Sequence, residues 1–175
     1  MASTRFLIAV ALLATAGAAR AAEGPGILVW FGSYTGAPPK AEGISVARFD
    51  PATGHLSPAV TAAVLKNPSF LALHPTLPVL YAVSEVEDTD GQRAGSLTAL
   101  AIDRRTGMLT PINHQVTGRS TPCHVSVDRA GRAALAANYG GGSTVCLGIE
   151  PDGRLRPLVE GAPGGHLQHV GKSVN

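Results

Sequence analysis

The sequence predicts an all-β protein built from repeated four-stranded units. Short apolar runs are separated by turn residues throughout, with 21 glycines and 13 prolines among 175 residues, and this pattern favours strands over helices. Similar segments begin at Gly43, Gly95 and Gly142, which are 52 and 47 residues apart. Four short strands in a period of about 50 residues are typical of a β-propeller blade. A β-sandwich or a β-solenoid is the alternative, although solenoid periods are shorter.

Alternating apolar positions place the strands of the first two units. In the first unit, strands are expected at Ile27–Tyr34, Gly43–Asp50 and Leu56–Leu65. In the second unit, they are expected at Pro68–His74, Val79–Glu85, Gly95–Asp103 and Met108–Val116.

The third unit opens with a hairpin between Pro122 and Gly142. Its first strand starts next to His124, and its second strand ends in Asn138, Tyr139 and three glycines. Antiparallel pairing brings the start of one strand beside the end of the other. We therefore expect these polar residues to meet at one edge of the sheet.

The up-and-down path of each unit places its connections at two ends. One end has short turns that resemble each other, at Thr53–Gly54, Thr76–Pro78, Thr106–Gly107 and Asp152–Gly153. The other end collects polar, glycine-rich connections of different lengths, at Gly32–Thr35, Asn67–Ser69, Ser84–Glu87, Gly118–His124, Asn138–Gly142 and the tail from Gly164 to Asn175. Because sites concentrate on irregular loops held by a rigid scaffold, function is expected at the second end.

The first 21 residues have the features of a signal peptide. Arg5 is followed by an apolar segment from Phe6 to Ala16, which is too short to span a bilayer, and by the small-x-small cleavage pattern Ala19-Arg20-Ala21. The sequence therefore predicts export, with the periplasm as the expected compartment. It also predicts a mature domain from residue 22 to 175. An uncleaved N-terminal anchor is the alternative.

The net charge and the positions of the two cysteines argue against two kinds of binding partner and against a disulfide. The formal net charge is +2 with scattered Lys and Arg, so neither nucleic-acid binding nor membrane binding after signal cleavage is expected.

Cys123 and Cys146 fall on the first and third strands of one unit. Those strands lie about 9.6 Å apart, beyond the roughly 7 Å that a disulfide allows between Cα atoms, so two separate buried thiols are expected.

Five sequence motifs resemble the bacterial propeller-type 6-phosphogluconolactonases, a family of seven-bladed lactonases. They read Phe-Gly-Ser-Tyr-Thr, Asn-Pro-Ser-Phe-Leu-Ala-Leu-His-Pro, Leu-Tyr-Ala-Val-Ser-Glu, Thr-Pro-Cys-His-Val-Ser-Val-Asp and Ala-Asn-Tyr-Gly-Gly-Gly-Ser, in this order between Ile27 and Asn175. The resemblance implies about three blades of seven here. It also implies that further active-site Arg and His residues would follow Asn175, so a truncated chain is expected.

Lactone opening is ester hydrolysis, which needs a base for water, donors for the oxyanion and an acid for the leaving alkoxide. The resemblance makes His124 the candidate base, and Glu85 a carboxylate for acid/base chemistry or for pairing with an arginine. Asn138 and Tyr139 are expected either to bind sugar hydroxyls or to wall the channel, and Tyr34 occupies the corresponding place in the first unit.

The glycine run Gly140, Gly141 and Gly142 has two interpretations: backbone N–H groups aimed at an anion, or a turn that needs positive φ. His55, His74 and His114 are expected to be surface residues, and His166 and His169 to be solvated in a terminal loop. No metal or other cofactor is expected.

The implied function is hydrolysis of a sugar lactone, 6-phosphogluconolactone or a related aldonolactone. The expected partner is this small molecule, and the sequence leaves the oligomeric state open. A non-catalytic exported propeller that binds a partner or acts as a scaffold is the alternative.

Overall fold

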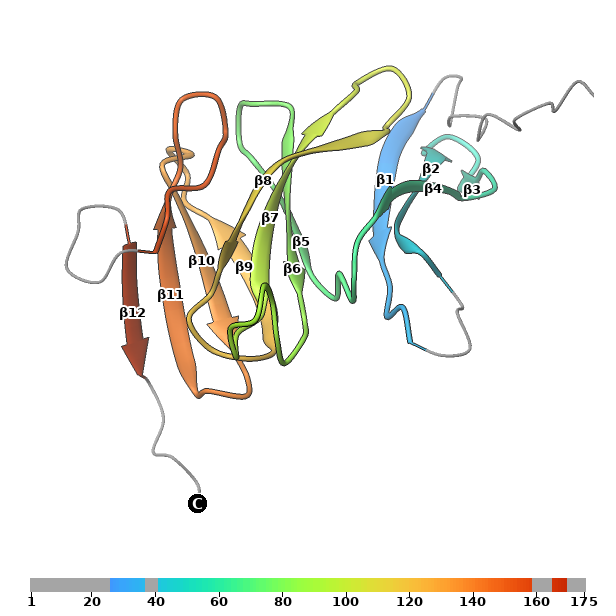
Figure 1. Ribbon diagram of the computed structural model, residues 1–175. Helices are drawn as coiled ribbons and strands as arrows, with labels where there is room; N and C mark the ends of the chain where they lie inside the picture. The colour runs from blue at the N-terminus through green and yellow to red at the C-terminus, as the bar shows by residue number, and fades with distance from the viewer. Residues whose placement is uncertain (1–25, 37–40, 159–164, 170–175) are drawn as a thin grey trace, which may run out of the picture.

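The computed structural model describes residues 26–36, 41–158 and 165–169. These residues form twelve β-strands and no helix, and hence none that could cross a membrane. The strands make three antiparallel four-stranded sheets that stand side by side (Figure 1). The prediction of an all-β protein made of four-stranded units is therefore confirmed. The predicted signal peptide and the last six residues of the tail lie outside the described residues.

The first sheet is centred on β2, Gly43–Asp50. It pairs on one edge with β1, Ile27–Gly32, and on the other with both β3, His55–Leu56, and β4, Val60–Val64. The sequence predicted one continuous strand in place of the last two, and this is wrong. The chain leaves the ladder between them at Pro58, which has no backbone N–H to donate.

The other two sheets follow the order of the chain. The second contains β5, Leu71–Leu73; β6, Val79–Ser84; β7, Ser96–Ile102; and β8, Leu109–Val116. The third contains β9, Pro122–Val127; β10, Ala133–Asn138; β11, Ser143–Gly148; and β12, Gly165–His169. The expectation of a loop around His166 and His169 is wrong, because this segment pairs with β11 as the outer strand.

Apolar side chains fill both spaces between the sheets. Successive residues of β6 point to opposite sides, as in any strand, and all six are buried. Leu80 packs toward the first sheet in a cluster with Ile44, and Tyr81 packs toward the third sheet in a cluster with Val145. The second sheet is therefore buried on both faces, which fixes the relative positions of the loops at its ends.

Two aromatic side chains also join neighbouring sheets through hydrogen bonds. The indole Nε1 of Trp30 donates to the Gly107 carbonyl at 2.8 Å. The hydroxyl of the buried Tyr81 donates to the Gly153 carbonyl at 2.8 Å, and burial raises the pKa of this phenol. Trp30 lies on β1 and Tyr81 on β6, and each bond runs to a glycine turn of the next sheet. The repeat therefore also specifies how neighbouring sheets pack together.

Each sheet has connections at two ends. We call one end the turn face, formed by residues 51–54, 74–78, 103–108, 128–132 and 149–155. We call the other end the loop face, formed by residues 32–36, 65–70, 85–95, 117–124 and 139–142. The loop face is the lower end in Figure 1, where the β6–β7 and β10–β11 connections lie.

The turn face repeats one device, an aspartate that accepts backbone N–H groups of its own turn. Asp50 accepts from Ala52, and Asp103 accepts from Arg105. Asp128 accepts from the N–H groups of residues 130, 132 and 133. Such hydrogen bonds favour the ionised form and so lower the pKa of all three carboxyl groups. For Asp50 the main cause is the hydroxyl of Thr53, which donates to it at 2.7 Å, and the N–H of Ala52 adds to it.

His74 departs from the expectation of an exposed residue, since it is only 8% exposed. Its Nδ1 accepts the N–H groups of Thr76 at 3.1 Å and Leu77 at 2.9 Å. The proton therefore sits on Nε2, which donates to the Gly131 carbonyl of the third sheet at 3.0 Å. His74 thus caps its own turn and joins two sheets.

Candidate active site

The loop face brings together two of the predicted site residues, Tyr34 and Glu85. They come from different sheets and are 51 positions apart, and the Tyr34 hydroxyl donates to Glu85 Oε2 at 2.8 Å. This bond is the main reason that the pKa of Tyr34 is raised. The phenol is 61% exposed, so the pair is open to solvent and to a ligand.

Two junctions on the loop face share one backbone arrangement. Asn67 and Thr121 each precede a proline and have positive φ, 45° and 51°. The Asn67 carbonyl accepts the N–H of Glu85 at 3.0 Å, and the Thr121 carbonyl accepts the N–H of Tyr139 at 2.9 Å. The repeat therefore makes Glu85 and Tyr139 equivalent, each placed by the junction that precedes its unit.

The same correspondence pairs His124 with Phe70, three residues after each junction residue. The two rings are in contact, with centroids 4.3 Å apart and planes at 47°. His124 is exposed on the inner strand β9, opposite Ala137 of β10. A histidine held against an aromatic ring and open to solvent can take a proton from a bound water. Phe70 is not among the predicted site residues, although its place in the repeat, equivalent to that of His124, is visible in the sequence.

The two parts of the site are close to each other. The N–H of Thr121, directly before β9, donates to the carbonyl of Val86, the residue after Glu85, at 2.9 Å. Tyr34, Glu85 and the start of β9 therefore belong to one region, to which all three sheets contribute.

Asn138 lies apart from this solvent-exposed group, since only 2% of it is exposed. Its Nδ2 donates to the Thr117 carbonyl at 3.1 Å and to Ser143 Oγ at 3.2 Å. Its Oδ1 is buried without a hydrogen-bond partner among the described residues. The amide thus joins the second and third sheets, and Oδ1 is the atom of this side chain that a ligand could use.

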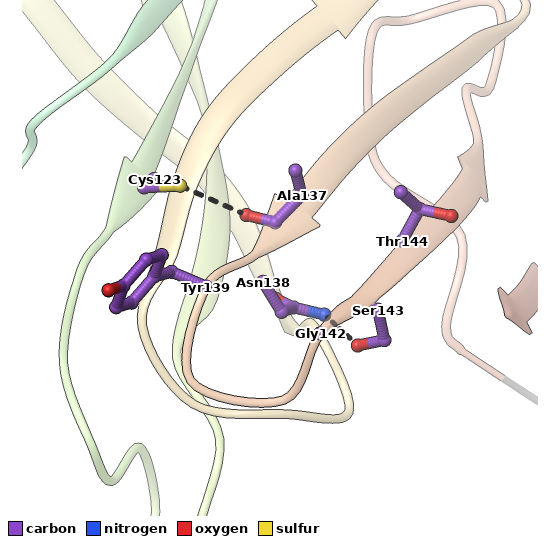
Figure 2. Close-up of a pocket in the computed structure, with 7 residues that line it drawn as sticks. All are labelled: Cys123, Ala137, Asn138, Tyr139, Gly142, Ser143 and Thr144. Carbon is purple, nitrogen blue, oxygen red and sulfur yellow. Dashed lines mark hydrogen bonds between the residues drawn. The ribbon is translucent and has the colours of Figure 1, made fainter. Parts of the chain in front are cut away.

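Tyr139 is 82% exposed and stands at the rim of a hollow of about 440 Å³ on the outer side of the third sheet (Figure 2). The hollow is lined by Cys123, Ala137, Asn138, Tyr139, Gly142, Ser143 and Thr144. Figure 2 shows the Tyr139 ring turned away from Ser143 and Thr144, so Tyr139 lies between this hollow and the rest of the loop face.

The glycine run supports the turn interpretation more than the anion cradle. The N–H of Gly140 donates to Thr121 Oγ1 at 2.6 Å, and the N–H of Gly142 donates to the Tyr139 carbonyl at 3.3 Å. Gly142 has a φ of 53°. Gly141 lies against the Arg119 side chain, where a Cβ atom would meet Arg119 Cβ and Cγ. Two of the three N–H groups are therefore already used, one by the neighbouring loop and one within its own loop.

The prediction that the cysteines stay unpaired is confirmed. Cys123 and Cys146 are free and lie on β9 and β11, with β10 between them. Both are half-buried rather than fully buried, and partial burial raises the pKa of the Cys146 thiol.

A comparison with known protein families identifies the chain. Residues 28–170 match the family described as lactonase, 7-bladed beta-propeller. The chain belongs to this family. The three sheets are therefore blades of a propeller, and the loop face is one end of the propeller.

Two curated relatives carry the name 6-phosphogluconolactonase. The protein from Bacillus subtilis is 36% identical over 141 residues, which cover 80% of this chain and 38% of the relative. The protein from Formosa agariphila is 30% identical over 132 residues, which cover 75% of this chain and 36% of the relative. The chain thus matches less than two-fifths of the length of either protein.

Solved structures show the same fold over a similar share. A putative 6-phosphogluconolactonase from Bacteroides uniformis matches with a TM-score of 0.66 and 35% identity, over 74% of this chain and 35% of that one. A periplasmic gluconolactonase from Pseudomonas aeruginosa matches with a TM-score of 0.66 and 32% identity, over 76% of this chain and 37% of that one.

Proposed function

We propose that this protein takes part in the hydrolysis of a sugar lactone at its loop face. The observation that carries the proposal is the group formed there by Tyr34, Glu85 and His124, in a chain that belongs to a lactonase family. Ester hydrolysis uses a base, an acid and a donor for the oxyanion, and an imidazole, a carboxylate and a phenol can supply these functions.

In the proposed reaction, His124 accepts a proton from water as the water oxygen bonds to the lactone carbonyl carbon. The bond from that carbon to the ring oxygen then breaks, and the ring oxygen becomes a hydroxyl by taking the proton that His124 received, which Glu85 passes on as the acid/base group. Tyr34 keeps its proton at neutral pH, and its bond to Glu85 raises the pKa of the phenol further. The hydroxyl donates its one proton to Glu85 in the free protein, and in the proposed reaction it turns from Glu85 to donate to the oxygen that gains negative charge.

For the substrate, we favour an aldonolactone without a phosphate group. The predicted signal peptide supports export to the periplasm, and a similar solved structure is named a periplasmic gluconolactonase. The relatives named 6-phosphogluconolactonase support the phosphorylated lactone as the second candidate.

The test is hydrolysis of gluconolactone and of 6-phosphogluconolactone, measured as acid release above the spontaneous rate. We expect His124→Ala to lose the catalysed rate while its thermal melt is unchanged. Ser126→Ala is the matched control, because Ser126 is a polar residue exposed two positions further along the same strand. Equal rates for the two variants would remove His124 from the mechanism, and no catalysed rate with either lactone would contradict the proposed function.

A further inference from the structure

The side chain of Asn67 makes hydrogen bonds to two other segments of the loop face. Its Oδ1 accepts the backbone N–H of Thr35 at 3.0 Å and the Thr35 hydroxyl at 3.1 Å. Its Nδ2 donates to the Glu85 carbonyl at 3.2 Å. One short side chain therefore joins the loop after β1 to the loop after β6.

These two loops carry the two members of the phenol–carboxylate pair. Tyr34 directly precedes Thr35, and Glu85 is itself the second partner of Asn67. We propose that Asn67 is a positioning residue, which holds Tyr34 and Glu85 at hydrogen-bonding distance by fixing the backbone next to each of them. Its side-chain hydrogen bonds go to Thr35 and to the Glu85 carbonyl, so it acts through its neighbours in the chain and through the backbone.

The chemistry of the position requires asparagine. The amide offers an acceptor to Thr35 and a donor to Glu85, a combination that neither aspartate nor leucine can supply. Asparagine also tolerates positive φ better than most residues do, and here φ is 45°. Glycine would allow this backbone conformation but would lose both side-chain contacts.

The second junction separates this role from the general structure of the repeat. The Thr121 carbonyl accepts the N–H of Tyr139 just as the Asn67 carbonyl accepts the N–H of Glu85. The Thr121 side chain, however, reaches the backbone of Gly140 within its own sheet. The backbone contact is thus shared by both junctions, whereas the side-chain bridge between two sheets occurs where the Tyr34–Glu85 pair lies.

The direct readout is the titration of the Tyr34 hydroxyl, followed by NMR of ring-labelled tyrosine. The sequence contains three tyrosines, and Tyr34→Phe identifies the signal of Tyr34. We expect Asn67→Gly to shift the pKa of Tyr34 downward, toward the ordinary value, because the bond to Glu85 is its main cause of elevation. Thr121→Gly, which alters the equivalent position, should leave the Tyr34 titration unchanged.

A second variant breaks the bridge from its other side. Thr35→Val replaces the hydroxyl at constant shape and changes no residue of positive φ, so it tests the same contact even where Asn67→Gly does not fold. We expect a smaller shift in the same direction, since the Thr35 N–H still reaches Asn67 Oδ1. If both variants fold, an unchanged Tyr34 titration in both would overturn the proposal. If only Thr35→Val folds, an unchanged Tyr34 titration in that variant would overturn it.

The consequence for lactone hydrolysis rests on the proposed function. Misplacing a catalytic group by about 1 Å costs up to about 100-fold in rate, so Asn67→Gly should lower kcat at least tenfold with a smaller change in KM. The two proposals fail separately. If Asn67→Gly shifts the Tyr34 titration but the unaltered protein hydrolyses no lactone, the positioning role stands and the proposed function does not.

Discussion

The turn face and the loop face close the same three sheets in different ways. On the turn face, Asp50, Asp103 and Asp128 each accept N–H groups from their own turn, so one local device is used repeatedly. On the loop face, Tyr34 bonds to Glu85 of another sheet and His124 stacks against Phe70 of another sheet. The turn face therefore combines one repeated local device with hydrogen bonds between blades, which Trp30, Tyr81 and His74 make. On the loop face, the predicted site residues themselves make the contacts between blades.

The electrostatic effects of the two faces follow the same division. Hydrogen bonds within each turn lower the pKa values of the three aspartates, and their charge is used to stabilise those turns. On the loop face, the bond to Glu85 raises the pKa of Tyr34, so a proton is held in place on an exposed group. Only the second arrangement holds a proton between the side chains of two different sheets.

The largest expected effect is that of Glu85→Gln on lactone hydrolysis. This change removes the carboxylate charge, and general acid–base groups contribute about 100- to 10,000-fold to rates, so kcat/KM should fall within that range. Glu87→Gln, an exposed carboxylate two residues further along the same loop, should hydrolyse the lactone as the unaltered protein does. A similar loss in both variants would show that charge on the loop, rather than the Glu85 carboxylate, matters.

A smaller effect is expected for Tyr34→Phe. The ring stays while the donor to Glu85 is lost, and a lost hydrogen bond to a charged group is worth about 1.5–3 kcal/mol. The catalysed rate should therefore fall by roughly one to two orders of magnitude. A steady-state assay gives this value directly, and unchanged kinetics would exclude Tyr34 from the mechanism.

The contact between blades can be weakened without touching the loop face. Tyr81→Phe removes the buried hydroxyl that donates to the Gly153 carbonyl, which should lower the free energy of unfolding by about 1–2 kcal/mol. Chemical denaturation measures this loss. Because Gly153 lies on the turn face, kcat should not change, and a loss of rate at unchanged stability would contradict the separation of the two faces.

The smallest effects are expected from the turn aspartates, and they depend on pH. The pKa of Asp128 in the folded protein is below its value in the unfolded chain. Its stabilising contribution is therefore complete above the unfolded pKa, about 3.9, and is lost as the pH falls through the folded pKa. Thermal melts of Asp128→Asn should show a lower Tm at neutral pH and a smaller loss of Tm as the pH falls. A loss of Tm at low pH equal to that of the unaltered protein would be inconsistent with this role.

Much of the fold could be predicted because the repeat depends on local patterns. The strand Gly43–Asp50 was predicted with the bounds that the structure gives, because its alternation is regular and glycine and proline stand at its two ends. The errors came where a local pattern misled. Pro58 interrupts an apolar run, and Gly165–His169 lacks strong strand-forming residues, yet it pairs because β11 offers a free edge.

The site could be located from the sequence but its contacts could not. The repeat placed Tyr34, Glu85 and His124 on one face, whereas the bonds of Asn67 and the burial of His74 depend on the distance between sheets. Residues 32 and 57 positions apart make those contacts, and no local pattern records them. The sequence left two interpretations of the glycine run open for the same reason, because the Thr121 hydroxyl that takes one of its N–H groups comes from a different loop.

One measurement tests most directly whether the loop face carries the reaction. Gluconolactone hydrolysis and Tm are determined together for two charge-neutralising variants, Glu85→Gln on the loop face and Asp103→Asn on the turn face. We predict that Glu85→Gln loses the catalysed rate and keeps its Tm, and that Asp103→Asn keeps the rate and has a lower Tm. Loss of the rate in Asp103→Asn with full activity in Glu85→Gln would contradict the account.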